Sequence, residues 1–468
     1  MRIARAILLL ASLLPIGAEC EQSYRVYTEH PRLWLDARRL RLLRRERERD
    51  SIRWQQLQLL VKSGQALPEE PLVEAFEYQV AQDEPAGRQA TAWAVKRAGV
   101  AGDPDAEELR RLAVVLDWCY PLFGEAERAA VVKRMARGIA QVSAQNGIRP
   151  FASAALAAIA VADDWPGSEQ ALAAAFEKRW RQALLPRLRE GRALDAPEDR
   201  VAFLEMCHAV RNNLQLDLWE QAPAYFKQFP YYLLLQYYPA PVTVGGHRFR
   251  QPSQPSSARP DPAVAGQLAR VAELLTAAYD TNSVETQFLQ GWITHDIYRL
   301  RAPSGALYEF LWMNPYQPGL SYYNVPLHLY DELGGRLWAR SSWDDDATWV
   351  GYFDGELQLF ADGKPTVINS KLQPAPIVFP QAAVVAASGE ASFKVLLTEG
   401  EDVYVVGLEP GKTYWVKSGA ALFVPRTAGK GGILSLQVET GTETAFELKA
   451  SDPNPPAPAM EGKKKKRK

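Results

Sequence analysis

The sequence predicts an α+β multidomain protein, with an N-terminal α/α toroid of antiparallel helical hairpins followed by a C-terminal antiparallel β-sandwich. Two observations lead to this expectation. Apolar residues recur at steps of three and four from about residue 36 to 301, which is the period of buried helices. Beyond residue 320 the period changes to two, which indicates strands. The expected boundaries are a signal peptide at 1–20, the toroid at 21–320, the sandwich at 321–450 and a disordered basic tail at 451–468.

The first segment, MRIARAILLLASLLPIGAEC (1–20), has two arginines, an apolar run and then small residues. This order is typical of a secretory signal peptide. The sequence therefore predicts an exported protein, either periplasmic or extracellular. Cys20 leaves lipid anchoring open, although Glu19 occupies a position where a lipid-attachment motif has a small residue. No later stretch is apolar for long enough to predict an integral membrane segment.

The helical part consists of apolar-periodic runs separated by short polar breaks. Examples of the runs are LRRLAVVLDW (109–118) and RAAVVKRMARGIAQV (128–142), and breaks such as DDWPGSEQ (163–170) carry Pro, Gly and Ser. Short connections between long helices predict antiparallel hairpins. Because no fixed-period repeat is present, a closed toroid is favoured over an open solenoid. The Pro- and Ser-rich stretch 239–263 is expected to be a linker or a long loop over the toroid mouth.

The C-terminal third contains short runs rich in β-branched and aromatic residues, such as TWVGYFDGELQLFADG (348–363). Asp344, Asp345 and Asp346 precede this run, and we expect them to form a turn between two strands rather than a metal site. After removal of the leader, Cys119 and Cys207 remain, and they are expected to be buried thiols or one optional disulfide.

Composition excludes several classes of function. The formal net charge of −1 gives no reason to expect nucleic acid as a partner. No pair of the five histidines has the close spacing of a zinc site, so no metal is expected. Phosphate-binding glycine loops, dinucleotide fingerprints and serine nucleophile elbows are missing from the sequence, so no cofactor is expected either.

The strongest cluster of candidate site residues lies on the predicted helix 201–219. Glu205, His208, Arg211, Asn212 and Gln215 follow one another at helical steps and are expected to share one face. Imidazole, guanidinium and amide groups together can neutralise a carboxylate while a neighbouring group removes a proton. The alternative is an ordinary amphipathic helix with a solvated polar face.

Four further residues are candidates because of their surroundings. Tyr225 and Tyr232 belong to an aromatic run that would suit sugar rings, although such a run is commonly core. Asn146 and His247 lie in predicted loops that would line a cleft, or they are simple turn residues. A glycoside hydrolase is a different possibility, and it would need two converging carboxylates, for which Glu205 and Asp217 are available.

Three motifs in order along the chain carry a resemblance to a known family. HPRLWLDARRLRLLR (30–44), DWCYPLFGEAERAAVV (117–132) and GGRLWARSSWDDDATWVGY (334–352) resemble the heparinase II/III-like polysaccharide lyases. The resemblance implies a toroid followed by a sandwich, export, and β-elimination on an acidic polysaccharide or oligosaccharide that contains uronic acid.

The resemblance also implies roles for individual residues. Asn146 matches the family's loop asparagine, although Gly147 follows it where the family has His, and Tyr225 matches its toroid tyrosine. Together with His208, Arg211 and Asn212, which are candidates from the helix spacing alone, Tyr225 forms the predicted catalytic group. Asn146, with Glu205, Gln215, Tyr232 and His247 as candidates from their spacing or surroundings, forms the predicted substrate-binding group. The family's His-x-His-x-Asp run does not follow the Trp-Asp motif, and no histidine occurs after His328. The sequence thus leaves two functions open, a lyase and a catalytically inactive glycan-binding or cell-envelope protein.

Overall fold

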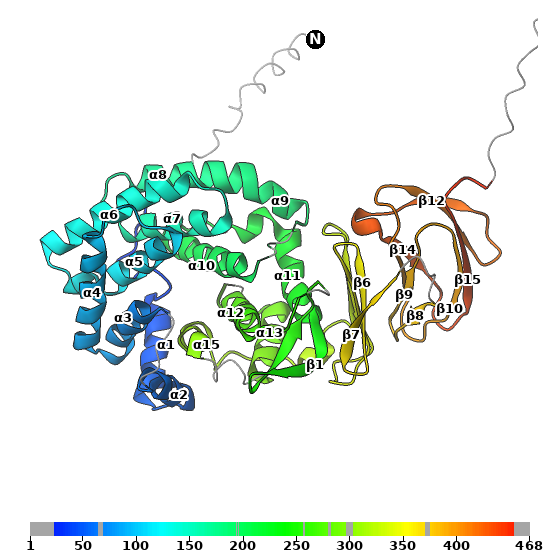
Figure 1. Cartoon of the computed structure of the whole chain (residues 1–468), viewed down its shortest axis with the longest axis horizontal. Helices are drawn as coiled ribbons and strands as arrows, with labels where there is room; N and C mark the ends of the chain where they lie inside the picture. The colour runs from blue at the N-terminus through cyan, green and yellow to red at the C-terminus, as the bar shows by residue number, and fades with distance from the viewer. Residues whose placement is uncertain are drawn as a thin grey trace, which may run out of the picture.

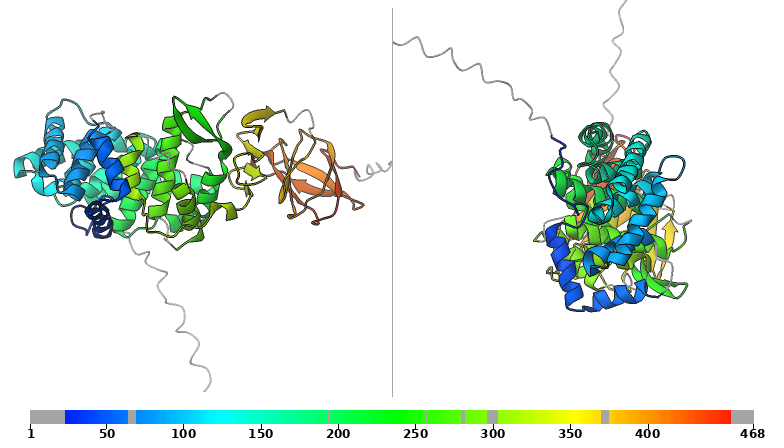
Figure 2. Two further views of the ribbon diagram at one scale, coloured as in Figure 1. Left: turned by 90° about the horizontal axis from the view of Figure 1, so that it is seen from below. Right: turned by 90° about the vertical axis from the view of Figure 1, so that its left-hand side faces the viewer.

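The computed structural model describes residues 23–63, 69–192, 194, 196–255, 258–278, 282–295, 303–369 and 375–453. It is an α+β structure, in which helices of the N-terminal part and sheets of the C-terminal part lie at opposite ends of an elongated molecule (Figures 1 and 2). The predicted signal peptide, Cys20 and nearly all of the predicted basic tail lie outside the described residues. No helix in the described ranges is both long and apolar enough to cross a membrane.

The helices begin where the polar breaks of the sequence end. The side chains of Asp36, Ser51, Asp83 and Asp105 each accept a hydrogen bond from a backbone N–H in the first turn of the following helix. The helices are α1 Ala37–Glu48, α2 Ile52–Val61, α3 Glu70–Ala81, α4 Glu84–Ala98, α5 Ala106–Trp118, α6 Glu125–Ser143, α7 Ile148–Ala160, α8 Ser168–Ala175, the π-helical segment Phe176–Leu184, α9 Leu185–Arg189, α10 Pro197–Leu214, α11 Pro223–Leu235, α12 Pro262–Ala278, α13 Val284–His295 and α15 Pro303–Trp312.

Alternate helices form one continuous series. In chain order, α3, α5, α7, α10, α12 and α15 each pack against the next, and α15 also packs against α2. The helices α4, α6 and α8 pack against one another in a second row. The large buried side chains of this part, including Trp34, Trp118 and Phe76, belong to one shared core.

The segment before α1 is held by one buried carboxylate. Asp117, near the end of α5, is fully buried and accepts hydrogen bonds from the backbone N–H groups of Arg32 and Leu33 at 2.7–3.0 Å. It also contacts His30 Nδ1 at 2.6 Å. These bonds satisfy backbone donors that would otherwise be buried without a partner, and they place Leu33 and Trp34 in the core. The motif HPRLW is therefore an anchoring segment.

A β-hairpin occupies the first part of the segment that we expected to be a linker or loop. β1 (Tyr237–Val244) pairs with β2 (His247–Pro252) in an antiparallel register, and Gly245 and Gly246 form the turn. Both glycines have positive φ angles, 57° and 81°, which the tight two-residue hairpin turns require. The prediction is wrong for 239–252, because Gly245 and Gly246 close a hairpin that the prolines of the two strands do not prevent.

The strands of the described C-terminal part form a five-stranded sheet and two four-stranded sheets. The five-stranded sheet has the order β3 His328–Asp331, β4 Arg336–Arg340, β5 Trp349–Phe353, β6 Glu356–Ala361 and β7 Lys364–Ile368. One four-stranded sheet contains β14 Leu434–Gln437, β11 Asp402–Val406, β9 Ala382–Ala386 and β8 Ile377–Val378, and the other contains β10 Ala391–Val395, β15 Thr444–Lys449, β12 Thr413–Ser418 and β13 Val424–Thr427. The prediction that all strands of this part pair antiparallel is wrong for one pair, since β9 and β11 are parallel.

The sheets are stacked through alternating side chains. Val403 and Val405 of β11 belong to the core shared by the two four-stranded sheets. Tyr404 and Val406 point to the other side and share a core with the five-stranded sheet. Trp349 of β5 in turn belongs to the helical core, and its indole Nε1–H donates to the carbonyl of Leu235 at 2.8 Å. The five-stranded sheet therefore connects the helical part to the remaining strands.

The triple-aspartate segment is a turn, as predicted. It lies between β4 and β5, and the backbone N–H of Asp344 donates to Ser342 Oγ at 3.1 Å. Asp345 accepts a 2.8 Å hydrogen bond from Arg250 of β2, so this turn also fixes the hairpin. Cys119 and Cys207 are both buried, free thiols, and the optional disulfide is not formed.

Candidate functional site

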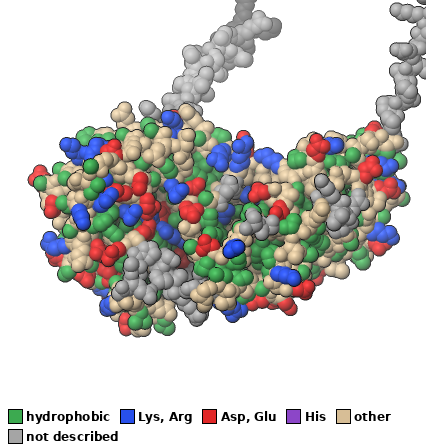
Figure 3. All heavy atoms as spheres, viewed as in Figure 1, with side chains coloured by type: hydrophobic (Ala, Val, Ile, Leu, Met, Phe, Trp, Pro, Cys, Tyr) green, Lys and Arg blue, Asp and Glu red, His purple; other side chains and the backbone are tan. Residues whose placement is uncertain are grey.

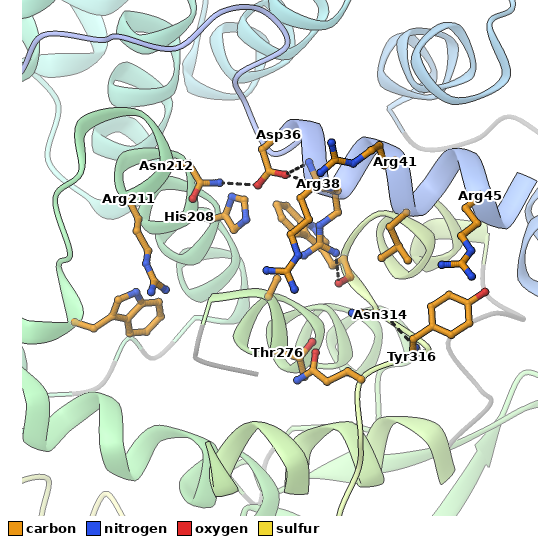
Figure 4. A pocket seen from close by; sticks show the side chains of 16 residues that line it. Asp36, Arg38, Arg41, Arg45, His208, Arg211, Asn212, Thr276, Asn314 and Tyr316 are labelled. Atoms are coloured by element: carbon orange, nitrogen blue, oxygen red, sulfur yellow. Dashed lines mark hydrogen bonds between the residues drawn. The ribbon is translucent and has the colours of Figure 1, made fainter. Parts of the chain in front are cut away.

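A cleft of about 880 Å³ lies between α1, the last turns of α10 and α12, and the segment after α15. Five arginines line it, namely Arg38, Arg39, Arg41, Arg45 and Arg211, whereas Asp36 is the one carboxylate among its described lining residues. We call this feature the arginine cleft (Figure 4). On the face of the molecule shown in Figure 3, basic and acidic side chains are interspersed, and the formal net charge of the chain is −1. The positive charge of the cleft is thus a local feature.

The helix α10 contributes three predicted catalytic residues to the cleft. His208, Arg211 and Asn212 lie at i, i+3 and i+4 in its last two turns, so their side chains emerge from one face. The helix ends at Leu214 because Gln215 adopts the left-handed conformation with φ 53°. Asn212 Nδ2 donates to Asp36 Oδ2 at 3.3 Å, which joins α10 to the start of α1.

His208 is a neutral imidazole at the floor of the cleft. It is 6% exposed, and its ring meets Trp312 edge to face at a centroid distance of 5.0 Å. The pKa of His208 is lowered to about 3, mainly by burial. The positive charges of Arg39 and Arg211 contribute to this lowering, and the negative charge of Asp36 opposes it. Its Nδ1 atom is buried and has no hydrogen-bond partner among the described residues.

Two charged residues of the cleft, Asp36 and Arg39, also stabilise the fold. Asp36 caps α1, since its Oδ1 accepts hydrogen bonds from the backbone N–H groups of Arg38 and Arg39. The Arg39 guanidinium donates to the carbonyls of Leu311 and Trp312 at the end of α15, at 3.1 and 2.6 Å. Burial lowers the pKa of Arg39 to about 10, which still leaves it charged at neutral pH.

The three remaining cleft arginines of α1, Arg38, Arg41 and Arg45, are exposed to solvent at the rim. Arg38, Arg41 and Arg45 form no ion pair with any residue in the described part of the chain. The guanidinium of Arg45 lies over the ring of Tyr316 at 5.7 Å. Tyr316 is 52% exposed, and its hydroxyl donates to Glu46 Oε1 at 2.5 Å. Trp219 and Trp312 are the other aromatic side chains among the described lining residues.

Two predicted substrate-binding residues lie in a different cavity. Glu205 and Asn146 line a space of about 630 Å³ at the N-terminal ends of α5, α7 and α10. Glu205 is fully buried and forms ion pairs with Arg110, at 2.7 Å, and with Arg270. Asn146 accepts a 2.7 Å hydrogen bond from Arg179. The two ends of α10 therefore face different cavities, and Glu205 does not line the arginine cleft with His208, Arg211 and Asn212. The solvated-face alternative fails too, because Glu205 and His208 are buried.

Tyr225 and Tyr232 lie at a third place, next to Arg336, around a space of only about 20 Å³. Burial raises the pKa of Tyr225 to about 12, and Tyr232 accepts a 2.8 Å hydrogen bond from Arg200. Tyr225 is therefore not brought together with His208, Arg211 and Asn212. His247 is the first residue of β2, and its side chain lies outside the described part of the structure.

Sequence reasoning missed the residues that give the cleft its charge. Arg38, Arg41 and Arg45 follow one another at helical steps in ARRLRLLRRERE, and this spacing was the available signal. Tyr316 and Trp219 carry no local signal, because their positions depend on the packing of α15 and α10. No group of three or more His, Cys, Asp or Glu residues in the described ranges is arranged to hold a metal ion.

Comparisons with known proteins identify no family. No protein-family model matches the sequence, and no curated protein matches it either.

Proposed function

We propose that this chain is an exported protein that binds an acidic polysaccharide or oligosaccharide in the arginine cleft. The observation that carries the proposal is the excess of guanidinium groups, five against one carboxylate, in a cleft of about 880 Å³. Guanidinium groups bind carboxylates and sulfates through paired hydrogen bonds. Trp219 and Tyr316 add aromatic surfaces on which sugar rings can pack.

The fold belongs to the same proposal. The series of helices from α3 to α15 is interpreted as an α/α toroid, because α15 packs back against α2 near its beginning. The stacked C-terminal sheets are interpreted as a β-sandwich. This architecture is the one expected from the resemblance to heparinase II/III-like lyases, and it would present the cleft at one mouth of the toroid.

Binding is the better supported activity because of His208. A general base works best with a pKa near the working pH. His208 has a pKa of about 3, more than three units below its ordinary value, so the imidazole is a weak base in the unliganded cleft. A bound carboxylate would find a neutral ring and several guanidinium groups, which suits recognition.

The experiment is a binding titration on the full mature chain. Polygalacturonate, alginate and heparan sulfate are compared with neutral dextran by isothermal calorimetry at low and high salt. We expect binding of at least one acidic glycan, weakened by salt and by the double substitution Arg38→Ala/Arg41→Ala. Arg49→Ala is the matched control, because Arg49 follows α1 and is exposed outside the cleft. Absence of binding to every acidic glycan would refute the proposal.

Cleavage by β-elimination is the second candidate, and the contact between Tyr316 and Glu46 favours it. The Tyr316 hydroxyl donates to Glu46 Oε1 at 2.5 Å, so Glu46 is placed to take the hydroxyl proton while the phenol oxygen takes the proton of the substrate. In this reaction a base removes the C5 proton of the uronate, the electron pair forms the C4–C5 double bond, and the C4–oxygen bond breaks. The leaving oxygen then takes up a proton from bulk water, while the cleft arginines mask the carboxylate.

Absorbance of the unsaturated uronate product tests this second activity. We expect Tyr316→Phe to abolish product formation, whereas Tyr323→Phe, an exposed tyrosine outside the cleft, retains it. Loss of activity in Tyr225→Phe instead would return the catalytic role to the residue assigned from the sequence. If the wild-type chain binds a glycan panel but yields no product, the protein is a binder.

A further inference from the structure

The arginines at the rim of the cleft are arranged as a ladder. Arg38, Arg41 and Arg45 occupy positions i, i+3 and i+7 of α1, so they share one face of the helix. At a rise of 1.5 Å per residue, the first and last are separated by about 10 Å along the helix axis. Other arginines of α1 are committed elsewhere, since Arg39 binds the end of α15 and Arg44 donates to the carbonyl of Gln79.

The two ends of the ladder are chemically different. Near Arg38 lie His208, Arg211 and Asn212, and near Arg45 lies Tyr316 (Figure 4). The cleft is therefore elongated along α1, with the polar groups of α10 and the ring of Trp312 at one end and Tyr316 at the other.

Without a ligand, the three neighbouring guanidinium groups of the ladder repel one another and destabilise α1. Like charges at helical steps of three and four destabilise a helix by about 0.2–0.5 kcal/mol per pair. No carboxylate of the described residues pairs with these three side chains to offset that repulsion. A row of anionic groups on a ligand would remove it.

We infer that the cleft binds its ligand as an extended linear chain lying along α1, with acidic groups of successive sugars facing Arg38, Arg41 and Arg45. This inference rests on the proposed function and specifies the ligand further. A monosaccharide carries one carboxylate and can reach one arginine at a time, whereas an oligomer presents one at each ring. Linked contacts of this kind raise affinity without new types of interaction.

The test uses galacturonate oligomers of one, two, four and six residues, titrated by calorimetry against the full mature chain. Each exposed ion pair is expected to contribute a factor of about two to five. The two additional ion pairs should raise affinity by about four- to twenty-five-fold from monomer to tetramer, after which affinity should level off. Arg45→Ala should lower the affinity for the tetramer to nearly that for the dimer, whereas the affinity for the monomer should change by less than about twofold.

Control variants separate a ladder from general charge attraction. Arg49→Ala removes a guanidinium just beyond α1 but outside the cleft, and it should leave the length dependence intact. Arg38→Ala should shorten the effective ladder from the opposite end. Circular dichroism of each variant verifies that the helices are retained.

The outcomes distinguish this inference from the proposed function. Equal affinity for monomer and hexamer would overturn the ladder and leave the binding site in place. An equal loss in Arg49→Ala and Arg45→Ala, or equally tight binding of inorganic polyphosphate with the same dependence on Arg45, would show a general polyanion surface and overturn the inference. Absence of binding to every oligomer and to the acidic glycans would refute the proposed function itself.

Discussion

The buried imidazole of His208 makes a sharp prediction about stability and pH. Its pKa is lowered from an ordinary value of 6.5 to about 3 in the folded chain, chiefly by burial. The unfolded chain therefore binds a proton on this residue at a higher pH than the folded chain does. Stability from this group is complete above pH 6.5 and is lost as the pH falls toward 3.

The size of the effect follows from the shift. Each unit of pKa shift is equivalent to about 1.4 kcal/mol of unfolding free energy. The shift of the His208 pKa from 6.5 to about 3 therefore corresponds to roughly 5 kcal/mol between these two pH values. Between pH 6.5 and 4.5, two units of the range, the loss should be nearly 3 kcal/mol.

The assay compares wild type with His208→Asn by urea denaturation at several pH values between 7.5 and 4.5. All other titrating groups are common to both chains, so their effects cancel in the difference between the two free energies of unfolding. We expect the advantage of the wild type to shrink by about 1.4 kcal/mol per pH unit below 6.5. A difference that stays constant across this range would refute the claim that His208 is buried and neutral.

Three further predictions concern stability and reactivity. Glu205→Ala should cost about 3–5 kcal/mol, because it removes the fully buried carboxylate that Arg110 and Arg270 share and leaves Arg110 with only the more exposed Glu69 and Glu107. Glu107→Ala, at the half-exposed partner, should cost under about 1 kcal/mol; calorimetric melting measures both, and equal losses would contradict the burial argument. Asp117→Asn should loosen the anchoring segment at 30–34 and cost about 1–3 kcal/mol, seen as faster proteolysis near the N-terminus, and unchanged digestion would count against it. Burial raises the pKa of the Cys119 thiol to about 12 and that of the Cys207 thiol as well, so both should resist a thiol reagent until the chain unfolds; rapid labelling of the native protein would show that they are accessible.

Helix α10 shows what the spacing of apolar residues predicts and what it does not. The spacing of apolar residues predicts this helix and a shared face for His208, Arg211 and Asn212. In the structure these three residues line one cleft at the C-terminal end of the helix. The spacing does not reveal that Glu205, one turn earlier, faces another cavity and is held by arginines from α5 and α12. Periodicity defines a face of a helix, but the neighbours along its length decide what that face meets.

The C-terminal part shows the same limit. Alternating side chains predict the strands, and the Asp-rich turn between β4 and β5 is correctly placed. Alternation gives no information about which strand pairs with which, and the parallel contact of β9 with β11 was therefore missed.

The sequence by itself determined the helical region, the strands after residue 320, the Asp344–Asp346 turn and the shared face of His208, Arg211 and Asn212 on α10, because these depend on local spacing and turn chemistry. Tertiary structure decided the arginine cleft. Arg38, Arg41 and Arg45 become a lining only because α15 and the segment with Tyr316 pack beside α1, far along the chain. It likewise separated Tyr225 from His208 by burying the tyrosine next to Arg336. Contacts between distant segments arise from the burial of apolar surface in one core, and no local pattern encodes which polar groups that packing brings together.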